Sequence, residues 1–307
     1  MIPLPVGVTM GDPAGVGPEL VAELLRRVPE EACVLYGSRE VFRRAGVSER
    51  VRVVDIPFPE VDALVPGVAT AAGGRVSERA VRRAAADALD HRIRAMVTAP
   101  ICKEALHLAG CPLTAHTEIL EACCGNRVKP SMVFWSPNLT VGLATIHIPL
   151  SKVPQSLTID SLLQTIRRTA MVCGKAHPRV AVLGLNPHAG EHGLMGDEEQ
   201  KVIRPAIARA REEGVGEVWL AVPDAAFAHQ PLGFDCAVAM YHDQGLIPFK
   251  MLAFDCGVNV TAGLPLVRTS PDHGTAYDIA WKGKARVDSL LAAYRLAMRL
   301  SEPGAAL

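Results

Sequence analysis

The stretch VGVTMGDPAGVGPELVAELL, residues 6–25, decides the fold class. It opens on a short run rich in β-branched residues, typical of a buried strand, and the glycine-rich GDPAGVGP follows directly at residues 11–18. Residues 20–28 then carry apolar side chains at helical spacing, and Pro18 and Glu19 suit the first turn of a helix. This order of strand, loop and helix predicts a βα unit of a largely parallel sheet.

The same alternation recurs along the chain. Ser77 is expected to cap a helix over residues 78–93, Ala95–Thr98 and residues 179–185 are expected strands, and another helix is expected around Lys103. In DEEQKVIRPAIARAREEG, residues 197–214, Pro205 must kink a helix or begin a new one. Because no repeat or flexible linker marks a boundary, any division into domains has to come from crossings of the chain.

The composition limits the classes of function. Lys plus Arg and Asp plus Glu balance at 32 each in 307 residues, which gives no general attraction to nucleic acid or to an anionic membrane. No apolar run reaches the roughly 18 residues of a membrane-spanning helix, and the opening MIPLPVGVTM lacks the basic region of a signal peptide. The eight cysteines form no CxxC pair and are expected to be free thiols. We therefore expect a cytoplasmic protein without a nucleic-acid or membrane partner.

Four segments place polar residues where a parallel sheet normally binds ligands, at the carboxyl ends of its strands. They are GDPAGVGP (11–18), TIHIPL (145–150), LNPHAGEHG (185–193) and YHDQG (241–245). Three of them carry a histidine: His147, His188 and His242. Three imidazoles from separate strands can converge on one divalent cation and leave positions open for catalysis. The alternative, that each is a hydrogen-bonded structural histidine, is left open by the spacing alone.

Two further groups suggest anion and nucleotide binding. Lys250, Asn259 and Arg268 recur at intervals of nine and can form a cationic pocket for carboxylate or phosphate, or they can be ordinary surface residues. SPDHGTA (270–276) offers a turn and then backbone amides opening a helix at Thr275, a layout that suits a nucleotide or a simple helix cap. GDPAGVGP is neither a GxGxxG fingerprint nor a P-loop.

Six motifs in order, GDPAGVGPE, TAPICKEAL, HTE at 116–118, LNPHAGE, YHDQG and NVTAGLPLVRTSPDHGTAYDIAWKGKA, resemble the 4-hydroxythreonine-4-phosphate dehydrogenase (PdxA) family over nearly the whole chain. The resemblance implies the isocitrate and isopropylmalate dehydrogenase type of α/β fold, with two α/β/α domains and a cleft between them. The expected domains are 1–114 plus 250–307 on the cofactor side and 115–249 for metal binding and dimerisation. It also implies NAD or NADP bound without a Rossmann fingerprint, and a homodimer with a shared active site.

The resemblance implies a role for individual residues. A divalent metal (Zn2+, Mg2+, Mn2+ or Co2+) would be bound by His147, His188 and His242, which act in catalysis through it, the third ligand coming from the partner subunit. A small anionic, phosphorylated substrate would be bound by His116, Thr117, Asp224, Lys250, Asn259 and Arg268. The cofactor would be bound by Gly11, Asp12, Asp272, His273, Gly274 and Thr275.

The implied reaction is oxidation of the secondary hydroxyl of 4-phosphohydroxy-L-threonine followed by decarboxylation, in pyridoxal phosphate biosynthesis. The chain departs from the family's pattern at Ala115 and Trp281, where glycine is usual, in the stretch around Asp224, and in a shortened region at residues 50–75. Alternatives are a paralogue that oxidises 4-phospho-threonate or 4-phospho-erythronate, a cis-dihydrodiol carboxylate dehydrogenase, or a non-catalytic sensor of phospho-acids.

Overall fold

The computed structural model describes residues 4–127, 129–229, 231–253 and 255–302, which form two compact units. The first unit comprises the chain up to Pro130 and again from Gly263, and the second is Ser131–Ala262. The chain passes from the first unit to the second after Pro130 and returns after Ala262. Both points lie later in the chain than the expected boundaries, after residues 114 and 249. The helix that begins at His116 buries Ile119 and Leu120 in the core of the first unit, and the helix around residue 249 belongs wholly to the second.

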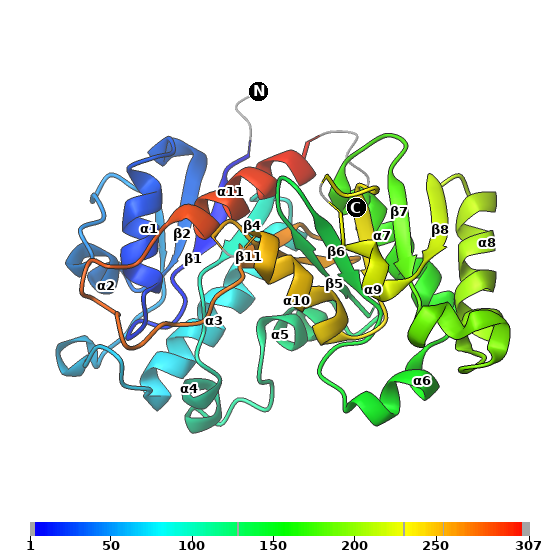
Figure 1. Ribbon diagram of the computed structural model, residues 1–307. Coiled ribbons are helices and arrows are strands. Elements are labelled where there is room, and N and C mark those ends of the chain that lie inside the picture. Colours follow the sequence, from blue (N-terminus) through cyan, green and yellow to red (C-terminus); the bar gives the residue numbers. More distant parts are fainter. Residues whose placement is uncertain (1–3, 128, 230, 254, 303–307) are drawn as a thin grey trace. The chain divides into compact units, whose positions relative to one another are not determined.

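The first unit is an α/β layer structure around a parallel sheet. Its strands lie in the order β3-β2-β1-β4-β11, and every pair within this order that is described is parallel. Figure 1 labels its main elements, and the bounds are β1 (Val6–Thr9), α1 (Gly17–Leu25), β2 (Cys33–Gly37), α2 (Arg39–Arg44), β3 (Val53–Asp55), α3 (Ala71–Leu89), β4 (Ala95–Thr98), α4 (Lys103–Leu108), α5 (His116–Cys123), β11 (Arg268–Pro271) and α11 (Asp288–Leu300), with short 3-10 turns at Glu30–Ala32 and Val61–Ala63.

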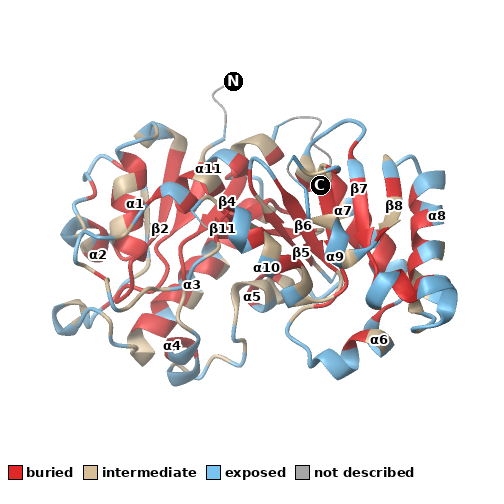
Figure 2. Ribbon diagram, in the orientation of Figure 1, coloured by how far each residue is buried: buried red, intermediate tan, exposed pale blue. Residues whose placement is uncertain are grey.

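Helices cover both faces of this sheet because its strands are apolar on both sides. Val34 and Tyr36 of β2 pack in one cluster with α3. Cys33, the residue before Val34, faces the other side of the strand and contacts Tyr294 of α11. The strands β1, β2, β4 and β11 are buried throughout, as the red ribbon in Figure 2 shows, whereas the edge strand β3 is partly exposed. Parallel strands covered in this way turn their carboxyl ends and following loops toward one edge, where ligands bind in this class of fold.

The second unit has a mixed sheet in the order β10-β5-β6-β9-β7-β8. β10, β5 and β6 pair antiparallel, and β6, β9, β7 and β8 pair parallel. The bounds are β5 (Ser131–Trp135), β6 (Thr140–Leu143), α6 (Val153–Ser156), α7 (Ile159–Cys173), β7 (Arg179–Leu183), η4 (Pro187–Gly193), η5 (Glu199–Ile203), α8 (Arg204–Glu212), β8 (Glu217–Ala221), α9 (Pro223–Ala226), β9 (Cys236–Ala239), α10 (His242–Ala253) and β10 (Val258–Ala262), with a 3-10 turn η3 at Leu150–Lys152.

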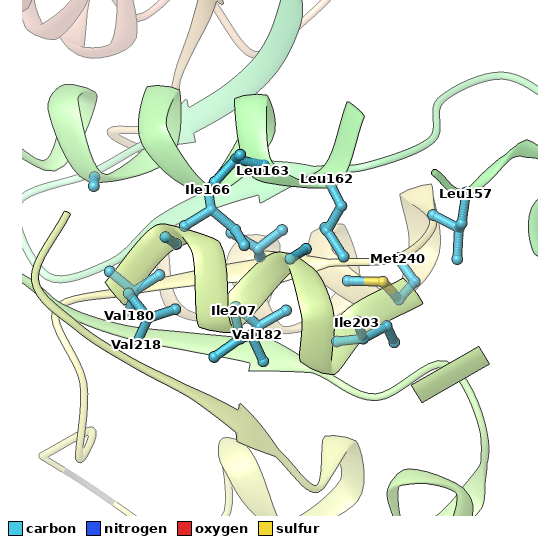
Figure 3. Close-up of a cluster of buried hydrophobic side chains, with 14 of the residues drawn as sticks. Leu157, Leu162, Leu163, Ile166, Val180, Val182, Ile203, Ile207, Val218 and Met240 are labelled. Atoms are coloured by element: carbon cyan, nitrogen blue, oxygen red, sulfur yellow. The ribbon is translucent and has the colours of Figure 1, made fainter. Parts of the chain in front are cut away.

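Alternate residues of β7 again supply two cores. Val180 and Val182 pack with Leu162 and Ile166 of α7 and with Ile207 of α8, the cluster drawn in Figure 3. Their neighbours Ala181 and Leu183 pack instead in the cluster that holds Leu246 and Phe249 of α10. A rigid, two-sided core therefore supports the loops that leave β6, β9 and β7.

Several local expectations hold and two are wrong. The strands expected at residues 6–9 and 95–98 are confirmed. A new helix also begins at Pro205 as expected: α8 starts at Arg204, directly after a single π-helical turn, and Pro205 lies in its first turn. Ser77 does not cap a helix, because α3 already begins after Thr70, whose side chain accepts the Gly73 N–H; the Ser77 hydroxyl instead donates to the Gly11 and Gly73 carbonyls.

No helix opens at Thr275 either, and the next helix begins only at Asp288. Ala276 and Trp281 have φ of 43° and 58°, left-handed values that a right-handed helix cannot contain. All eight cysteines carry free thiols, as expected. Within the described ranges, no helix combines the length and apolarity needed to cross a membrane.

Candidate active site

The three histidines singled out by the sequence follow three adjacent parallel strands of the second unit. His147 comes shortly after β6, His242 begins α10 after β9, and His188 lies in the loop after β7. The strand order β6-β9-β7 brings these connections to the same end of the sheet. The expectation that these segments lie at carboxyl ends of strands is confirmed by this topology.

Two of the three imidazoles lie side by side. The ring centres of His147 and His242 are 5.6 Å apart, with an angle of 44° between the ring planes. Two imidazoles bound to one tetrahedral metal through bonds of about 2.0–2.1 Å would have ring centres about 5 Å apart, so the pair fits a shared divalent cation. Nδ1 of His242 lies 2.6 Å from Oδ1 of Asp243, and a carboxylate there orients a metal-binding imidazole.

Buried and partly buried hydrogen bonds join the three loops that carry His147, His242 and His188. The Thr145 hydroxyl, two residues before His147, donates to the Met240 carbonyl at 2.7 Å, two residues before His242. Gln244 accepts the Met240 N–H at 2.7 Å through Oε1 and donates through Nε2 to the Gly184 carbonyl at 2.7 Å. Gly184 directly follows β7, so Gln244 joins the connections that carry His242 and His188.

His188 lies in a loop of uncommon backbone conformation. His188, Ala189, Glu191 and His192 have φ between 40° and 59°, and Gly190 and Gly193 are also left-handed. Such a conformation costs a non-glycine residue roughly 1–2 kcal/mol, and strain of this kind collects at functional sites. The His188 imidazole is exposed.

No group of three His, Cys, Asp or Glu side chains able to hold a metal is found in the part of the chain that the structure describes.

The first unit brings together Arg268 and His116. The Arg268 side chain is 2% exposed, and its Nε and Nη2 donate to the Thr98 hydroxyl at 3.0 and 2.7 Å. Burial lowers the pKa of Arg268 to about 9, so the guanidinium stays charged at neutral pH. Burial, and then the Arg268 charge, lower the pKa of His116 well below its usual value. His116 is therefore neutral at pH 7, and its buried Nε2 has no hydrogen-bond partner.

Thr117 lies beside this pair in the first turn of α5. No side chain caps this helix, so its first backbone N–H groups can receive an anion. Ala115, where the family's motif has glycine, has φ −148° and ψ 161°, an extended conformation that any residue adopts. The departure at Ala115 therefore places no strain on the backbone.

The remaining expected substrate residues lie in the second unit. Asp224 is exposed on α9, which packs against the loop of His188. Lys250 is exposed in the last turn of α10. Asn259 lies on β10, and its Oδ1 is buried without a hydrogen-bond partner. A buried acceptor of this kind is costly unless a ligand or water satisfies it.

The two expected cofactor segments, Gly11–Asp12 and residues 272–275, are held together within the first unit. The Val16 N–H donates to the Thr275 carbonyl at 3.0 Å, and the Tyr277 hydroxyl donates to Oδ2 of Asp12 at 3.1 Å. Burial raises the pKa of Asp12, against hydrogen bonds from the Ala14 N–H and Tyr277 that lower it. Nδ1 of His273 contacts the Gly274 carbonyl at 2.9 Å.

Trp281 also belongs to this region. Its left-handed φ of 58° explains why glycine suits the position, and its indole Nε1 donates to the Pro13 carbonyl at 2.9 Å. No pattern in the sequence predicts a role for Tyr277, Gln244 or Glu199. Gln244 stands inside the quoted motif YHDQG, but nothing in the sequence indicates that its amide bonds two neighbouring connections.

Comparison with known proteins gives a consistent result. The family model described as pyridoxal phosphate biosynthetic protein PdxA matches residues 22–297. The 4-hydroxythreonine-4-phosphate dehydrogenase of Aquifex aeolicus is 42% identical over 313 residues, which cover 95% of this chain and 96% of the relative. The D-threonate 4-phosphate dehydrogenase of Pectobacterium atrosepticum is 38% identical over 327 residues, which cover 96% of this chain and 99% of the relative.

Solved structures of related proteins also match this chain. The crystal structure of 4-hydroxythreonine-4-phosphate dehydrogenase from Klebsiella pneumoniae matches with a TM-score of 0.84 and 38% identity, covering 98% of this chain and 99% of that one. An isocitrate dehydrogenase from Methylococcus capsulatus matches with a TM-score of 0.52 at 16% identity, covering 98% and 86%, a likeness of fold alone. The expected fold class is thereby confirmed, and the chain belongs to the PdxA family.

Proposed function

We propose that the chain is an NAD(P)-dependent dehydrogenase that oxidises the secondary hydroxyl of 4-hydroxythreonine-4-phosphate, after which the β-keto acid loses CO2. The observation that carries this proposal is the pair His147 and His242, 5.6 Å apart at the carboxyl ends of parallel strands, in a chain 42% identical to a relative with that name. A divalent cation held by the pair would supply Lewis-acid chemistry at the substrate's hydroxyl, and NAD(P)+ would supply the hydride acceptor.

Arg268, His116 and Thr117 are proposed to bind the phosphate. Thr98 already orients the guanidinium, so its charge is fixed before an anion arrives. An anion next to Arg268 would offset the cost of burying that cation, and it would raise the depressed pKa of His116 so that the imidazole can donate a hydrogen bond. Lys250, Asn259 and Asp224 are proposed to contact the remainder of the substrate.

We further propose that a second copy of the chain completes the cation site with its His188. Within one chain His147 and His242 are paired, and the described residues contain no third ligand grouped with them. Large apolar side chains are exposed in the loops that follow β6 and β7 and on α10. Leu150 is 65%, Leu194 82% and Met251 80% exposed. Exposed apolar side chains on the elements that carry an incomplete ligand set fit a homodimer interface.

A second candidate substrate is D-threonate 4-phosphate, because the relatives from Pectobacterium and Salmonella that carry this name are 38% and 39% identical. It offers the same phosphate and secondary hydroxyl, and it differs by a hydroxyl in place of the 2-amino group. A cis-dihydrodiol carboxylate fits less well, since the buried Arg268 and His116 suit a compact anion. A non-catalytic sensor would have no use for the His147–His242 pair.

The test is NADH or NADPH release from 4-hydroxythreonine-4-phosphate, D-threonate 4-phosphate, 4-phospho-erythronate and a cis-dihydrodiol carboxylate, with Mg2+, Mn2+, Co2+ or Zn2+ added in turn. The highest kcat/KM is expected for 4-hydroxythreonine-4-phosphate. His242→Ala should lose nearly all activity, while the matched control His177→Ala, an exposed histidine that precedes β7, should keep it. A cation-loaded protein that reduces no cofactor with any compound would overturn the proposal and favour the sensor.

A further inference from the structure

Glu199 is a buried carboxylate beneath the loop that carries His188. Its side chain is 1% exposed. Oε1 accepts the backbone N–H groups of Leu185 and Asn186, both at 2.8 Å, and Oε2 accepts Nδ2 of Asn186 at 2.9 Å. A carboxylate is rarely buried, and here it is satisfied by donors that all come from the two residues before the loop.

The same carboxylate also lies against the middle of the loop. A Cβ atom added at Gly190 would lie 2.6 Å from Oε2 of Glu199, and one added at Gly184 would lie 3.3 Å from Oε1. Glu199 therefore touches the loop before His188 and after it. His188 and Ala189, where the left-handed segment begins, lie between these contacts.

The backbone around Glu199 directs its side chain inward. Glu199 begins the single π-helical turn η5, which leads into α8 at Arg204, and Pro205 follows without an amide hydrogen. A π turn widens the helix locally and is frequent near functional sites. In this turn Glu199 and Ile203 are buried, while the neighbouring Glu198 only reaches the Asn186 side chain, at 2.7 Å.

We infer that Glu199 is a positioning residue for His188: its carboxylate holds residues 185–190 in the conformation that presents the imidazole at the carboxyl end of β7. The residue acts through the backbone of the loop and does not touch substrate. The effect of Glu199 on cation binding rests on the proposed function, whereas its effect on the conformation of the loop does not.

The test compares Glu199→Gln with Glu198→Gln, which changes the adjacent carboxylate on the same turn. Two readouts are measured: hydrogen exchange of the Leu185 and Asn186 amides without any metal, and Co2+ affinity from the visible absorption of the bound ion. Replacing Glu199 removes one acceptor oxygen and puts an amide against Asn186. We expect faster exchange at both amides and Co2+ binding weakened roughly 10- to 100-fold, the usual effect of losing a residue that orients a ligand.

Glu198→Gln should change both quantities by less than about twofold, since Glu199 still accepts the Asn186 amide. If Glu199→Gln folds poorly, Gly190→Ala serves in its place, because it disturbs the same contact from the loop side. Gly190→Ala should likewise speed the exchange and weaken Co2+ binding. Exchange and Co2+ affinity equal in the Glu199 and Glu198 variants would overturn the inference. Wild-type protein that binds no Co2+ would instead refute the proposed function, and the exchange measurement would still decide whether Glu199 holds the loop.

Discussion

Mixing two inactive variants, His188→Ala and His242→Ala, tests whether the proposed cation site is shared between subunits. His147 and His242 lie in contact in one chain, so a complete site needs these two from one subunit and His188 from the other. In a twofold dimer of the two variants, one site then keeps all three imidazoles and the other lacks two. Random re-association of equal amounts gives half heterodimers, each with one intact site, so about a quarter of wild-type kcat should return.

The assay is NAD(P)H release after the variants have been unfolded and refolded together, with heterodimers verified by native mass spectrometry. The control mixture is His147→Ala with His242→Ala. These two ligands belong to the same chain, so each site of their heterodimer lacks one of them and no activity should return. No recovery in verified heterodimers of the first mixture, or equal recovery in both mixtures, would refute the assignment.

Three further predictions concern the first unit. Arg268→Lys keeps the charge but cannot make two bonds to Thr98 and still face an anion, so KM for the phosphorylated substrate should rise roughly tenfold or more; an unchanged KM in steady-state kinetics would contradict this. Because the pKa of His116 is lowered on folding, the unfolded chain binds the proton first, and stability should fall as the pH drops below about 6.5, by up to about 1.4 kcal/mol per pH unit. In urea titrations, His116→Gln should remove this dependence of the unfolding free energy on pH. An unaltered dependence in the variant would contradict the prediction. Gly74→Ala would place a Cβ 2.0 Å from the Ala105 carbonyl oxygen of α4 and should destabilise the protein by at least about 1–3 kcal/mol, whereas Gly233→Ala, with no atom nearby, should have little effect.

Local patterns in the sequence were enough to predict the strands and the end of the sheet at which the histidines lie. Val6–Thr9 and Ala95–Thr98 are short apolar runs, each followed within two residues by glycine or proline, and such runs form buried strands with little influence from the rest of the fold. The start of α3 was missed because Gly73 and Gly74 resemble a helix break. They lie inside the helix, where Gly74 permits the close approach of Ala105.

Other features depend on contacts distant in sequence. The segment after Pro271 is kept out of a helix by contacts with the first glycine-rich loop, including the Trp281 indole on the Pro13 carbonyl. Glu199 resembles an ordinary helical surface acid until the loop before it is folded onto its carboxylate. The pairing of His147 with His242 rather than with His188 follows from strand order and loop path, neither of which the spacing of the three residues encodes.

Anomalous diffraction from crystals of the protein grown with Co2+ or Zn2+ tests whether these three imidazoles share one cation. We expect one anomalous peak per subunit, about 2.0–2.1 Å from ring nitrogens of His147 and His242 and of the partner subunit's His188. A peak at any other place, or none at these imidazoles in protein that is active with the same ion, would contradict it.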